Sequence, residues 1–571
     1  MTSIGSKGCP CLLFLLFFVS SGLSAADLTI HGRVTDNSGK PLRGVEVKAA
    51  TKEKSISRFT QPDGRYELSV SPGSYLVSTD AFGYAGKREN VSVSQAQELN
   101  FTLTPKWDLG QLSGAELEQL IPDDASARLI KATCIDCHDF NVVEKRRGFT
   151  ASEWTAFIPE MTREKRPEFW RAYTPLKMNA LGVALEKYFG PDSTYFGPDA
   201  QPPTREQVKR PELSDAVLSA TFREYTIPTG AESDRPESFP HSVEVDQRDA
   251  WVAEVGYHAE KIGRLDIETE KFTEYPVPII YDPVTKRPIS NPHTGVIGKD
   301  GRIWETMATA GLDVPKLISL DPQTGNLKPY TFPGKQQGAH TPVLDQAGNL
   351  WITTNGVQGH GEVWLFDVKK EQFKAYDFPT PAEYPKDSDG DWRRVPGDTE
   401  HTTYATYHIG VDSKGKVWAN SMQMGILVRI DPATGETKEY FPPDCTGSRG
   451  LAIDQQDNVW FSDFFHHRLG FLDIKTGAFK MYRLPTPGAS VYGIVQDRKT
   501  GYVWLADFTG NHITRFDPRT EQFTEYPLPS RPSYPRFIDL APDGRIWFTE
   551  YWNGKIGVLD PGPGAKQSAS R

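Results

Sequence analysis

The pentapeptide from Cys134 to His138, CIDCH, concentrates more reactive chemistry than any other short stretch of this sequence. Two cysteines separated by two residues can form a redox disulfide, supply half of a zinc site or anchor a haem. The histidine directly after Cys137 favours the haem, because in C-x-x-C-H the thiols attach the porphyrin and the imidazole binds its iron. We therefore predict a covalent haem c on Cys134 and Cys137, with His138 as the proximal ligand.

The other cysteines make zinc and disulfide chemistry less favoured alternatives. Cys9 and Cys11 lie in the predicted export signal, so only Cys445 would remain beside the motif. A structural zinc site typically draws its ligands from two such pairs, and a thioredoxin-like redox pair belongs in a βαβ unit. The residues around CIDCH instead show helical periodicity.

The N-terminus predicts export. Lys7 precedes the apolar run LLFLLFFV, and the small residues Ser24 and Ala26 follow it at a cleavage-like position. We expect a signal peptide over residues 1–26 and a periplasmic or extracellular location, which suits covalent haem attachment. The run is too short to cross a bilayer, and no later run is longer, so we expect no transmembrane segment after signal removal.

Length and charge narrow the function classes. A chain of 571 residues is expected to contain several domains. With 24% charged residues and a net charge of -10, the composition argues against nucleic-acid binding, which needs concentrated Lys and Arg.

Residues 108–190 predict a small helical domain around the motif. Ser113 is a candidate N-cap, and Trp154, Phe157, Ile158 and Met161 share one helix face. With CxxCH, a basic cluster at residues 145–147 and W-x6-M, the segment resembles a mono-haem cytochrome c domain. The resemblance implies Met161 as the distal iron ligand, with Met178 as the alternative, although core filling is the competing interpretation of either side chain.

Residues 28–104 read as short alternating strands separated by Gly, Pro and Asp-Gly turns, which predicts a small β-sandwich. Through G-x-V-x-D-x-x-G-x-P-L-x-G-V-x-V, DGRYEL and PGSYLV the segment resembles the carboxypeptidase regulatory-like domain. That resemblance implies an accessory or docking module without catalytic residues. A Pro- and Gly-rich linker is expected over residues 191–221.

From residue 222 onward the chain repeats a short pattern. A tryptophan after an apolar pair recurs, and an aromatic-to-proline strand follows most of these tryptophans. The final tryptophan repeat has no such strand behind it, whereas EYTIP at 224–228 precedes the first repeat. This offset predicts that EYTIP completes the last blade. We expect a mainly β protein with a seven-bladed β-propeller over residues 222–561 and a disordered tail over residues 562–571. The repeated tryptophans are Trp251, Trp304, Trp351, Trp418, Trp460, Trp504 and Trp547.

Polar residues at equivalent positions of the repeats are expected to converge on the central channel. The position that opens each inner strand predicts one ring of imidazole, guanidinium and phenol groups. Its members are His241, His293, His340, His408, Arg449, Tyr492 and Arg536. Three residues after each tryptophan a second, partly acidic ring is expected, formed by Glu254, Met307, Thr354, Ser421, Asp463, Asp507 and Glu550.

The repeats DGRIWFTEYWNGKIGVLDP and TGAFKMYRLPTPG resemble those of the virginiamycin B lyase propellers. The resemblance implies a histidine base that opens an ester of a cyclic depsipeptide, next to magnesium held by glutamates. Pro240-His241 and Pro292-His293 match the family's paired strands, and Glu254 matches one glutamate. Asn291 and Ala308 stand where that pattern has glutamates, which puts the reaction in doubt.

The longest interval between repeats carries an insertion, KDSDGDWRRVPGDTEH. Its residues Asp387, Asp389 and Asp391 suggest a calcium loop, but a solvated acidic loop is the favoured interpretation. The insertion is also placed to bring His401 toward the channel.

Together these features predict a periplasmic c-type haem protein in electron transfer, whose propeller binds a small-molecule substrate or a redox partner protein. Two alternatives remain. One is a carbon–oxygen lyase in which His241, His293 and Glu254 act, with Mg or Ca in the propeller. The other is a non-catalytic binding or scaffold protein.

Overall fold

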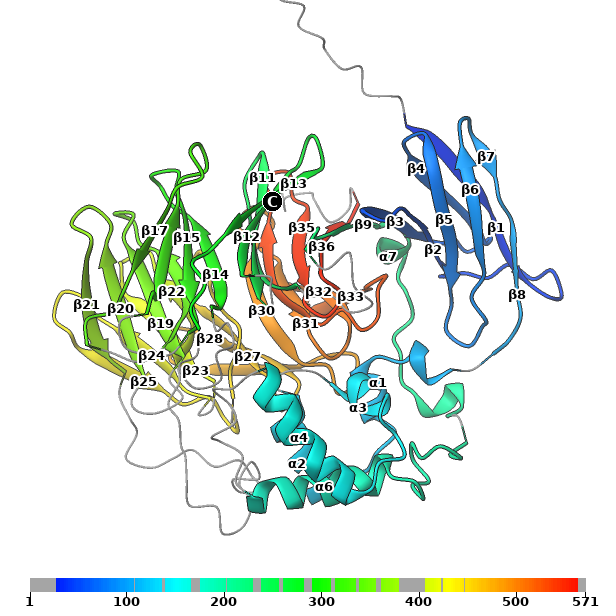
Figure 1. Cartoon of the computed structure of the whole chain (residues 1–571), viewed down its shortest axis with the longest axis horizontal. Coiled ribbons are helices and arrows are strands. Elements are labelled where there is room, and N and C mark those ends of the chain that lie inside the picture. Colours follow the sequence, from blue (N-terminus) through cyan, green and yellow to red (C-terminus); the bar gives the residue numbers. More distant parts are fainter. Residues whose placement is uncertain are drawn as a thin grey trace, which may run out of the picture.

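The chain is mainly β, with a small group of helices at one end of the strands (Figure 1). The computed structural model describes residues 27–106, 108–135, 139–165, 175–201, 203–229, 238–255, 260–281, 290–309, 314–334, 338–355, 361–378, 406–422, 425–445 and 447–562. The predicted signal peptide, Cys137, His138, the insertion with its aspartates and His401, and nearly all of the C-terminal tail lie outside these residues.

The N-terminal β domain consists of two sheets that share one apolar core. One sheet has the order β4-β1-β7, with β8 also paired to β1, and β3-β2-β5-β6 pack against it. The strand Arg65–Val70 alternates exposed and buried residues along its whole length, as the sequence predicts. The strands are β1 (Leu28–Asp36), β2 (Glu46–Ala50), β3 (Lys54–Phe59), β4 (Arg65–Val70), β5 (Gly73–Asp80), β6 (Arg88–Val93), β7 (Gln97–Glu98) and β8 (Phe101–Leu103).

A helical segment follows. Ser113 caps α1 with a complete capping box, because its hydroxyl accepts from Glu116 N and the Glu116 carboxylate accepts from Ser113 N. The helix predicted from the Trp154 face is present as α4. The elements are η1 (Leu109–Gln111), α1 (Gly114–Glu118), α2 (Ala125–Cys134), α3 (Phe140–Glu144), α4 (Ala151–Lys165) and α6 (Pro175–Phe189). The predicted linker contains η2 (Arg205–Gln207) and α7 (Asp215–Ser219). Among the described residues, no helix combines the length and apolar character that crossing a membrane requires.

Beyond the helices, the described residues form successive four-stranded antiparallel sheets. Each repeated tryptophan lies on the second strand of its sheet and is at most 3% exposed. The first six sheets are β10 (Phe239–Val245), β11 (Asp249–Val255), β12 (Lys261–Asp266), β13 (Lys271–Pro276); β14 (Pro292–Ile297), β15 (Ile303–Met307), β16 (Leu317–Leu320), β17 (Leu327–Tyr330); β18 (Gly338–Leu344), β19 (Leu350–Asn355), β20 (Glu362–Asp367), β21 (Gln372–Asp377); β22 (Thr406–Val411), β23 (Val417–Ser421), β24 (Leu427–Ile430), β25 (Thr437–Tyr440); β26 (Leu451–Ile453), β27 (Val459–Asp463), β28 (Arg468–Leu472), β29 (Phe479–Arg483); and β30 (Val491–Gln496), β31 (Val503–Asp507), β32 (His512–Asp517), β33 (Gln522–Pro527).

The last sheet is completed from the other end of this region. Strands β34 (Pro535–Leu540), β35 (Ile546–Glu550) and β36 (Lys555–Asp560) are joined by β9 (Thr221–Thr226), with Tyr225 opposite Ile556. The sequence predicts this pairing from the position of EYTIP. The first strands also contact one another in succession, from β10 through β14, β18, β22, β26 and β30 to β34, and β34 contacts β10.

The free edge of β9 pairs with the N-terminal domain, which the sequence does not indicate. Strand β3 runs antiparallel to β9, with Lys54 opposite Tyr225, so the two regions share one eight-stranded sheet. Polar contacts reinforce the junction. Ser55 Oγ donates to the Glu224 carboxylate at 2.6 Å, and Arg531 Nη1 lies 2.7 Å from Asp80 Oδ2.

The helical segment docks against one end of the repeated sheets (Figure 1). Ala115 N donates to Thr509 O at 2.9 Å, and His467 Nε2 lies 3.1 Å from Glu118 Oε1. One apolar cluster joins helix residues such as Leu117 and Trp154 to propeller aromatics such as Tyr492. The helices therefore lie over the ends of the strands where the predicted ring begins.

Candidate functional site

The first strands of most sheets break register at the same place. The irregularity lies between Pro240 and Val243 in β10, and strands β14, β18, β22, β30 and β34 each have one at the corresponding position. A β-bulge sets two residues against one and redirects their side chains. In β10, β14, β18 and β22 the predicted ring histidine lies within the bulge.

Three of these histidines pack against one another in a row, with their rings tilted by 36° and 54°. The rings of His241 and His293 have centroids 3.6 Å apart, and those of His293 and His340 are 4.2 Å apart. All three side chains are buried. Neighbouring threonines orient two of them, since His293 Nδ1 lies 3.1 Å from Thr294 Oγ1 and His340 Nδ1 lies 2.8 Å from Thr341 Oγ1.

Tyrosine and arginine side chains surround the three histidines. The Tyr407 ring packs 3.9 Å from the His340 ring, and the hydroxyls of Tyr407 and Tyr492 hydrogen-bond. Tyr492 Oη also lies 3.3 Å from His241 Nε2. Arg449 Nη1 donates to Tyr407 Oη at 3.1 Å. We call the following residues the axial cluster: His241, His293, His340, Tyr407, His408, Arg449, Tyr492 and Arg536.

Burial sets the charge of the axial cluster. It lowers the pKa of His340 well below 6.5, and His293, His408 and Arg449 lower it further. Burial and Arg449 together lower the pKa of His408 to about 3. Burial, with Tyr492 beside it, raises the pKa of Tyr407 well above 10. Arginine stays protonated in proteins, so the cluster combines the uncharged imidazoles of His340 and His408 and the uncharged Tyr407 phenol with two guanidinium charges.

The structure brings the predicted ring together. His408 lies somewhat apart, 6.4 Å from the His340 ring and 4.8 Å from Phe537. Arg536 stacks over Tyr551 at 3.5 Å and lies 5.2 Å from the Tyr492 ring. Sequence reasoning missed Tyr407, which directly precedes His408. The signal was an aromatic residue beside a ring position, but only the bulge reveals that two successive residues of one strand face the cluster.

The acidic side chains of the predicted second ring form hydrogen bonds or pack within their own sheets. Asp463 Oδ2 accepts from Arg468 Nε at 2.7 Å, and Glu550 Oε2 accepts from Ser533 Oγ at 3.0 Å. Glu254, predicted to be catalytic, packs over Gly263, where an added Cβ would lie 2.6 Å from its Oε1. Burial and Glu274 raise the pKa of Glu254 well above 4.5.

A channel metal has no assembled carboxylate ligands in the part of the chain that the structure describes. There, only Asp507, His512 and Glu525 bring three His, Cys, Asp or Glu ligand atoms within 4.8 Å of one another. Met307, and not Ala308, corresponds to Glu254, because Met307 pairs with Pro292 as Glu254 pairs with Pro240. The Glu305 carboxyl lies beside Glu244, where both approach Gly295. The magnesium and calcium sites stay predictions, and no step below depends on them.

The described part of the haem motif belongs to the same apolar packing as two tyrosines of the axial cluster, Tyr407 and Tyr492. Cys134 ends α2 and packs against the apolar cluster that contains Tyr492. The indole nitrogen of Trp154 is buried without a hydrogen-bond acceptor among the described residues, and a haem propionate would be a suitable one. Met178 is half-buried on α6. The side chain of Met161 is not described, and the haem stays a prediction.

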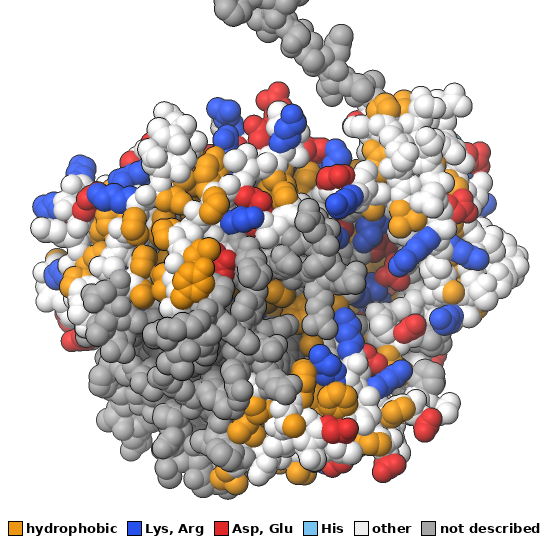
Figure 2. Space-filling model, in the orientation of Figure 1, with side chains coloured by type: hydrophobic (Ala, Val, Ile, Leu, Met, Phe, Trp, Pro, Cys, Tyr) orange, Lys and Arg blue, Asp and Glu red, His pale blue; other side chains and the backbone are white. Residues whose placement is uncertain are grey.

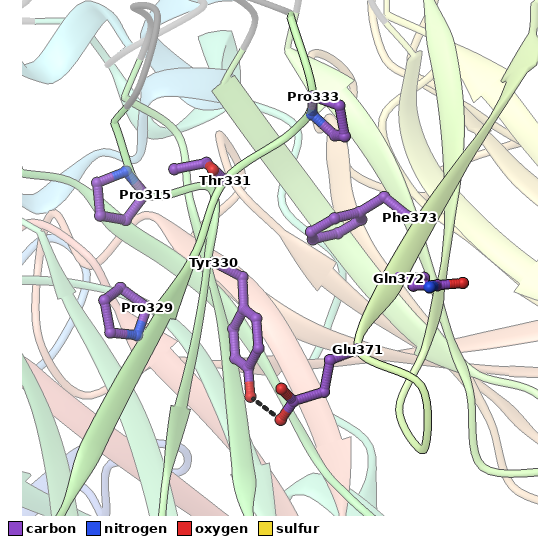
Figure 3. Close-up of a pocket in the computed structure, with 8 residues that line it drawn as sticks. All are labelled: Pro315, Pro329, Tyr330, Thr331, Pro333, Glu371, Gln372 and Phe373. Atoms are coloured by element: carbon purple, nitrogen blue, oxygen red, sulfur yellow. Dashed lines mark hydrogen bonds between the residues drawn. The ribbon is translucent and has the colours of Figure 1, made fainter.

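The outer strands of the sheets form an open groove that is separate from the axial cluster. An open groove of about 660 Å³ lies between the outer strands of the second and third sheets, where Tyr330 Oη donates to Glu371 Oε1 at 3.0 Å (Figure 3). No member of the axial cluster lines it. Figure 2 shows blue and red side chains interspersed over the described part of one face, which agrees with the argument against nucleic-acid binding.

Two family models match this chain. The carboxypeptidase regulatory-like domain matches residues 29–104, and the virginiamycin B lyase family matches residues 398–566. Both resemblances seen in the sequence are thereby confirmed as similarities of those segments. No curated protein matches.

Solved structures also show similarity to part of this chain. Virginiamycin B lyase from Staphylococcus aureus is 20% identical, with a TM-score of 0.47, and covers 60% of this chain and 99% of its own. A catalytically inactive form of that lyase with quinupristin is 19% identical, at 60% and 99% coverage and a TM-score of 0.48. A streptogramin B lyase is 21% identical, at 61% and 99% coverage and a TM-score of 0.48.

Proposed function

We propose that the repeated sheets form a closed seven-bladed β-propeller and that its axial cluster binds the carboxylate group of a small molecule. The pairing of β9 with β36 and the contact of β34 with β10 support closure, because they join the last sheet to both the start of the region and the first sheet. Equivalent inner-strand residues then face a common axis.

The observation that carries the proposal is a pair of buried imidazole nitrogens. Nε2 of His340 and Nε2 of His408 are buried without a hydrogen-bond partner among the described residues. An unsatisfied buried polar atom costs about 1–3 kcal/mol, so such atoms point to a missing partner. Arg449 and Arg536 lie in the same cluster and supply permanent positive charge. An anionic ligand with acceptor oxygens would satisfy both features.

A small carboxylic acid and its ester provide a direct test. We expect N-acetyl-phenylalanine to raise the melting temperature of the full chain, and its uncharged methyl ester to have little effect. Arg449→Met should remove the difference between the two compounds, whereas exchange of the exposed His31 for Ala should preserve it. Equal stabilisation by acid and ester, or none by either, would contradict carboxylate binding.

The match to the virginiamycin B lyase family supports elimination as the reaction at this site. His293 would take the proton next to the ester. The carbon–oxygen bond would then break, a carbon–carbon double bond would form, and the carboxylate would leave. Arg449 and Arg536 would hold that carboxylate, a role for which buried guanidiniums are suited. The proximity of His241 to His293 gives the base a second imidazole for hydrogen bonding.

Quinupristin is a suitable substrate for this reaction. Elimination opens its ring without a change in mass, whereas hydrolysis adds one water, so chromatography with mass spectrometry separates the two outcomes. We expect an isomeric product that is lost in His293→Ala and retained in His31→Ala. Activity that survives His293→Ala would exclude that base, and the absence of any product would leave ligand binding without elimination.

Haem-based electron transfer is the second candidate. The residue that follows His138 is bound to the propeller, since Asp139 accepts a hydrogen bond from Tyr534. We propose that Cys134 and Cys137 attach haem c after export, with His138 and Met161, or alternatively Met178, as iron ligands. When bound, haem would supply one-electron chemistry for a redox partner. A pyridine haemochrome spectrum of periplasmically expressed protein tests this, with Cys134→Ala as control. A wild-type spectrum without covalent haem would exclude it.

A further inference from the structure

Several sheets carry the same polar arrangement where the second strand ends and the third begins. In the first sheet Glu254 is opposite Lys261, in the fifth Asp463 is opposite Arg468, and in the last Glu550 is opposite Lys555. In the first and last sheets a glutamate from the fourth strand completes the group. Lys261 Nζ lies 3.2 Å from Glu274, and Lys555 Nζ lies 3.3 Å from Glu224.

The sixth sheet also has acidic residues at these two positions, but it has a histidine in place of the lysine or arginine. Asp507 on β31 is opposite His512 on β32, and Glu525 on β33 completes the group. The equivalence extends to the surroundings of the fourth-strand glutamate. Thr229 N donates to Glu274 at 3.0 Å, and Thr486 N donates to Glu525 at the same distance. His512 therefore occupies the position that a lysine or arginine fills elsewhere.

This replacement removes a permanent cation. Lysine and arginine carry a positive charge of their own. In the first and last sheets, which contain the lysine, the glutamate of the second strand is also protonated and therefore uncharged. Burial raises the pKa of Glu550 to about 8 and that of Glu254 well above 4.5. An imidazole is an uncharged metal ligand in the same position. The Asp507 and Glu525 side chains beside it are both buried.

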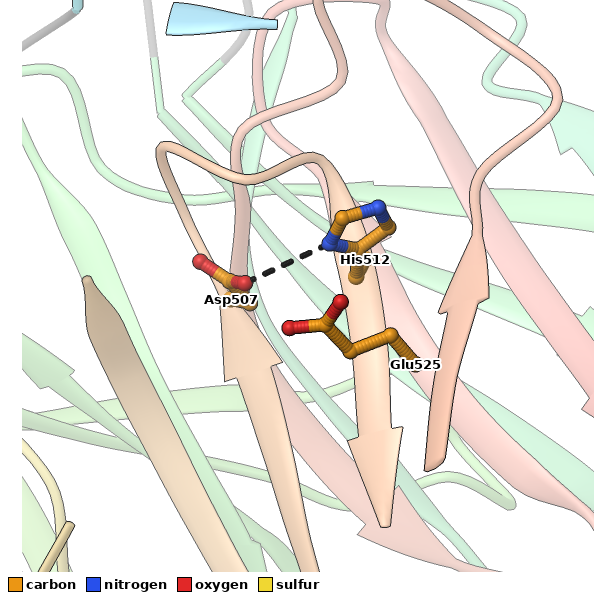
Figure 4. A group of neighbouring side chains, drawn as sticks. All are labelled: Asp507, His512 and Glu525. Atoms are coloured by element: carbon orange, nitrogen blue, oxygen red, sulfur yellow. Dashed lines mark ion pairs between the residues drawn. The ribbon is translucent and has the colours of Figure 1, made fainter. Parts of the chain in front are cut away.

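The distances suit ligands around an ion. His512 Nδ1 and Asp507 Oδ2 are 3.5 Å apart, which exceeds a normal hydrogen bond, and both atoms are buried without a hydrogen-bond partner among the described residues. Ligand atoms about 2.1 Å from a tetrahedral ion stand about 3.4 Å from each other. The side chains converge from three adjacent strands, with the Glu525 carboxylate beside the other two (Figure 4).

Backbone groups hold the acids in place. Asp507 Oδ1 accepts from Ser490 N at 3.1 Å and from Gly510 N at 3.0 Å, which leaves Oδ2 directed at His512. The Glu525 carboxylate accepts from Thr486 N and from Thr486 Oγ1. Such outer hydrogen bonds orient metal ligands in proteins. Asp507 Oδ2 and both Glu525 oxygens therefore retain lone pairs for an ion.

We propose that Asp507, His512 and Glu525 bind a divalent transition-metal ion, in the class of Zn²⁺, Mn²⁺ and Fe²⁺. One imidazole and two carboxylates form a donor set typical of these ions. The ion would replace the charge that lysine supplies in the first and last sheets. Its site adjoins the loop between β31 and β32, where Thr509 O accepts from Ala115 N of the helical segment. We infer a structural role in fixing that loop, independent of the axial cluster.

The competing interpretation is an ion triad in which His512 is protonated. Burial lowers the pKa of His512, but Asp507 and Glu525 raise it, and the net pKa is above 6.5. An imidazolium would then supply the missing positive charge without any metal. The two interpretations differ in their response to a lysine at this position.

The test uses full-length protein treated with EDTA and dialysed, titrated with Co²⁺ as the spectroscopic probe and with Zn²⁺ as the stabilising ion. We expect the wild type to bind one more equivalent of Co²⁺ than His512→Lys, and Zn²⁺ to raise its melting temperature. Lys261 and Lys555 indicate that His512→Lys will fold and remain stable without metal. Asp507→Asn should also lose the additional cobalt.

Equal cobalt uptake by the wild type and His512→Lys would overturn the proposal. So would a wild type whose melting temperature does not respond to Zn²⁺ or to EDTA. A folded His512→Lys variant, verified by circular dichroism, excludes misfolding as the cause of lost binding. Neither result depends on whether the axial cluster binds a ligand or catalyses a reaction.

Discussion

The Tyr534 hydroxyl donates a hydrogen bond to Asp139 Oδ1, which connects the propeller to the residue directly after the C-x-x-C-H motif. Both side chains are buried. The same Asp139 oxygen accepts from Asn141 N at 2.8 Å and so caps α3. One carboxyl group thus starts a helix of the motif segment and holds that segment on the propeller.

Removal of this hydrogen bond should loosen the helical segment. Tyr534→Phe leaves Asp139 with one buried partner fewer, so we expect a loss of about 1–3 kcal/mol in the free energy of unfolding. Denaturant titration measures the loss, and limited proteolysis should show faster cleavage between residues 108 and 201. Tyr281→Phe, at a side chain that is 58% exposed, is the matched control. Equal stability of the two variants would contradict the anchoring role.

Stability should depend on pH through Glu244. Burial, with Asp539 nearby, raises the pKa of this group to about 8, whereas an unfolded glutamate titrates near 4.5. The folded state therefore holds a proton that the unfolded state releases. The resulting stability is complete below about pH 4.5 and is lost as the pH rises through about 8.

Between about pH 4.5 and about pH 8, Glu244→Gln should reduce the fall in the free energy of unfolding by about 1.4 kcal/mol per pH unit. Unfolding free energies at several pH values, compared with those of a Glu268→Gln control at an exposed position, isolate the contribution of Glu244. Parallel curves for wild type and Glu244→Gln would show that Glu244 is ionised in the folded protein.

The proposed closure of the propeller should depend on β9. Phe222 on this strand is 1% exposed and packs edge-on against Phe59, with ring centroids 6.3 Å apart. Phe222→Ala would leave a cavity in the apolar cluster between the sixth and last sheets, so we expect a loss of about 3–5 kcal/mol in the free energy of unfolding. Phe441→Ala, at a side chain that is 49% exposed, should cost far less. Similar melting temperatures for both variants would indicate that β9 contributes little to closure.

The sequence predicts most of the β architecture because its signals are local and repeated. Tryptophans such as Trp418 mark the second strand of a sheet, and the early EYTIP strand correctly predicts the pairing of Tyr225 with Ile556. The predicted ring residues gather in one cluster because equivalent positions of equivalent sheets face the same direction. The hypothesis of a lyase-like propeller receives more support from the comparisons than the haem hypothesis, which rests on CIDCH and its surroundings.

Features that depend on long-range geometry escape the sequence. Tyr407 enters the axial cluster because a bulge in β22 redirects it, and no residue type marks that bulge. Glu254 follows its tryptophan as expected, yet its carboxyl group packs over Gly263 within its own sheet. The pairing of β3 with β9 joins residues far apart in the chain, and the alternation of β3 alone does not identify its partner.

The hydrogen-bonded junction of β3 and β9 should be sensitive to proline. Ser57 is opposite Phe222 on one side and Lys48 on the other, so Ser57→Pro removes a donor from a central strand. We expect a loss of about 3 kcal/mol or more, seen in thermal unfolding. Ser57→Ala keeps the backbone donor and should be much milder. Equal effects of the two substitutions would assign the cost to the side chain.

That junction also determines how the protein can be divided. A cut between the N-terminal domain and the propeller would uncover the backbone donors and acceptors along one side of both β3 and β9. Exposed strand edges pair with edges of other copies and promote aggregation. We therefore expect each part, expressed alone, to aggregate more readily than the intact chain, in which β3 and β9 cover each other's edge.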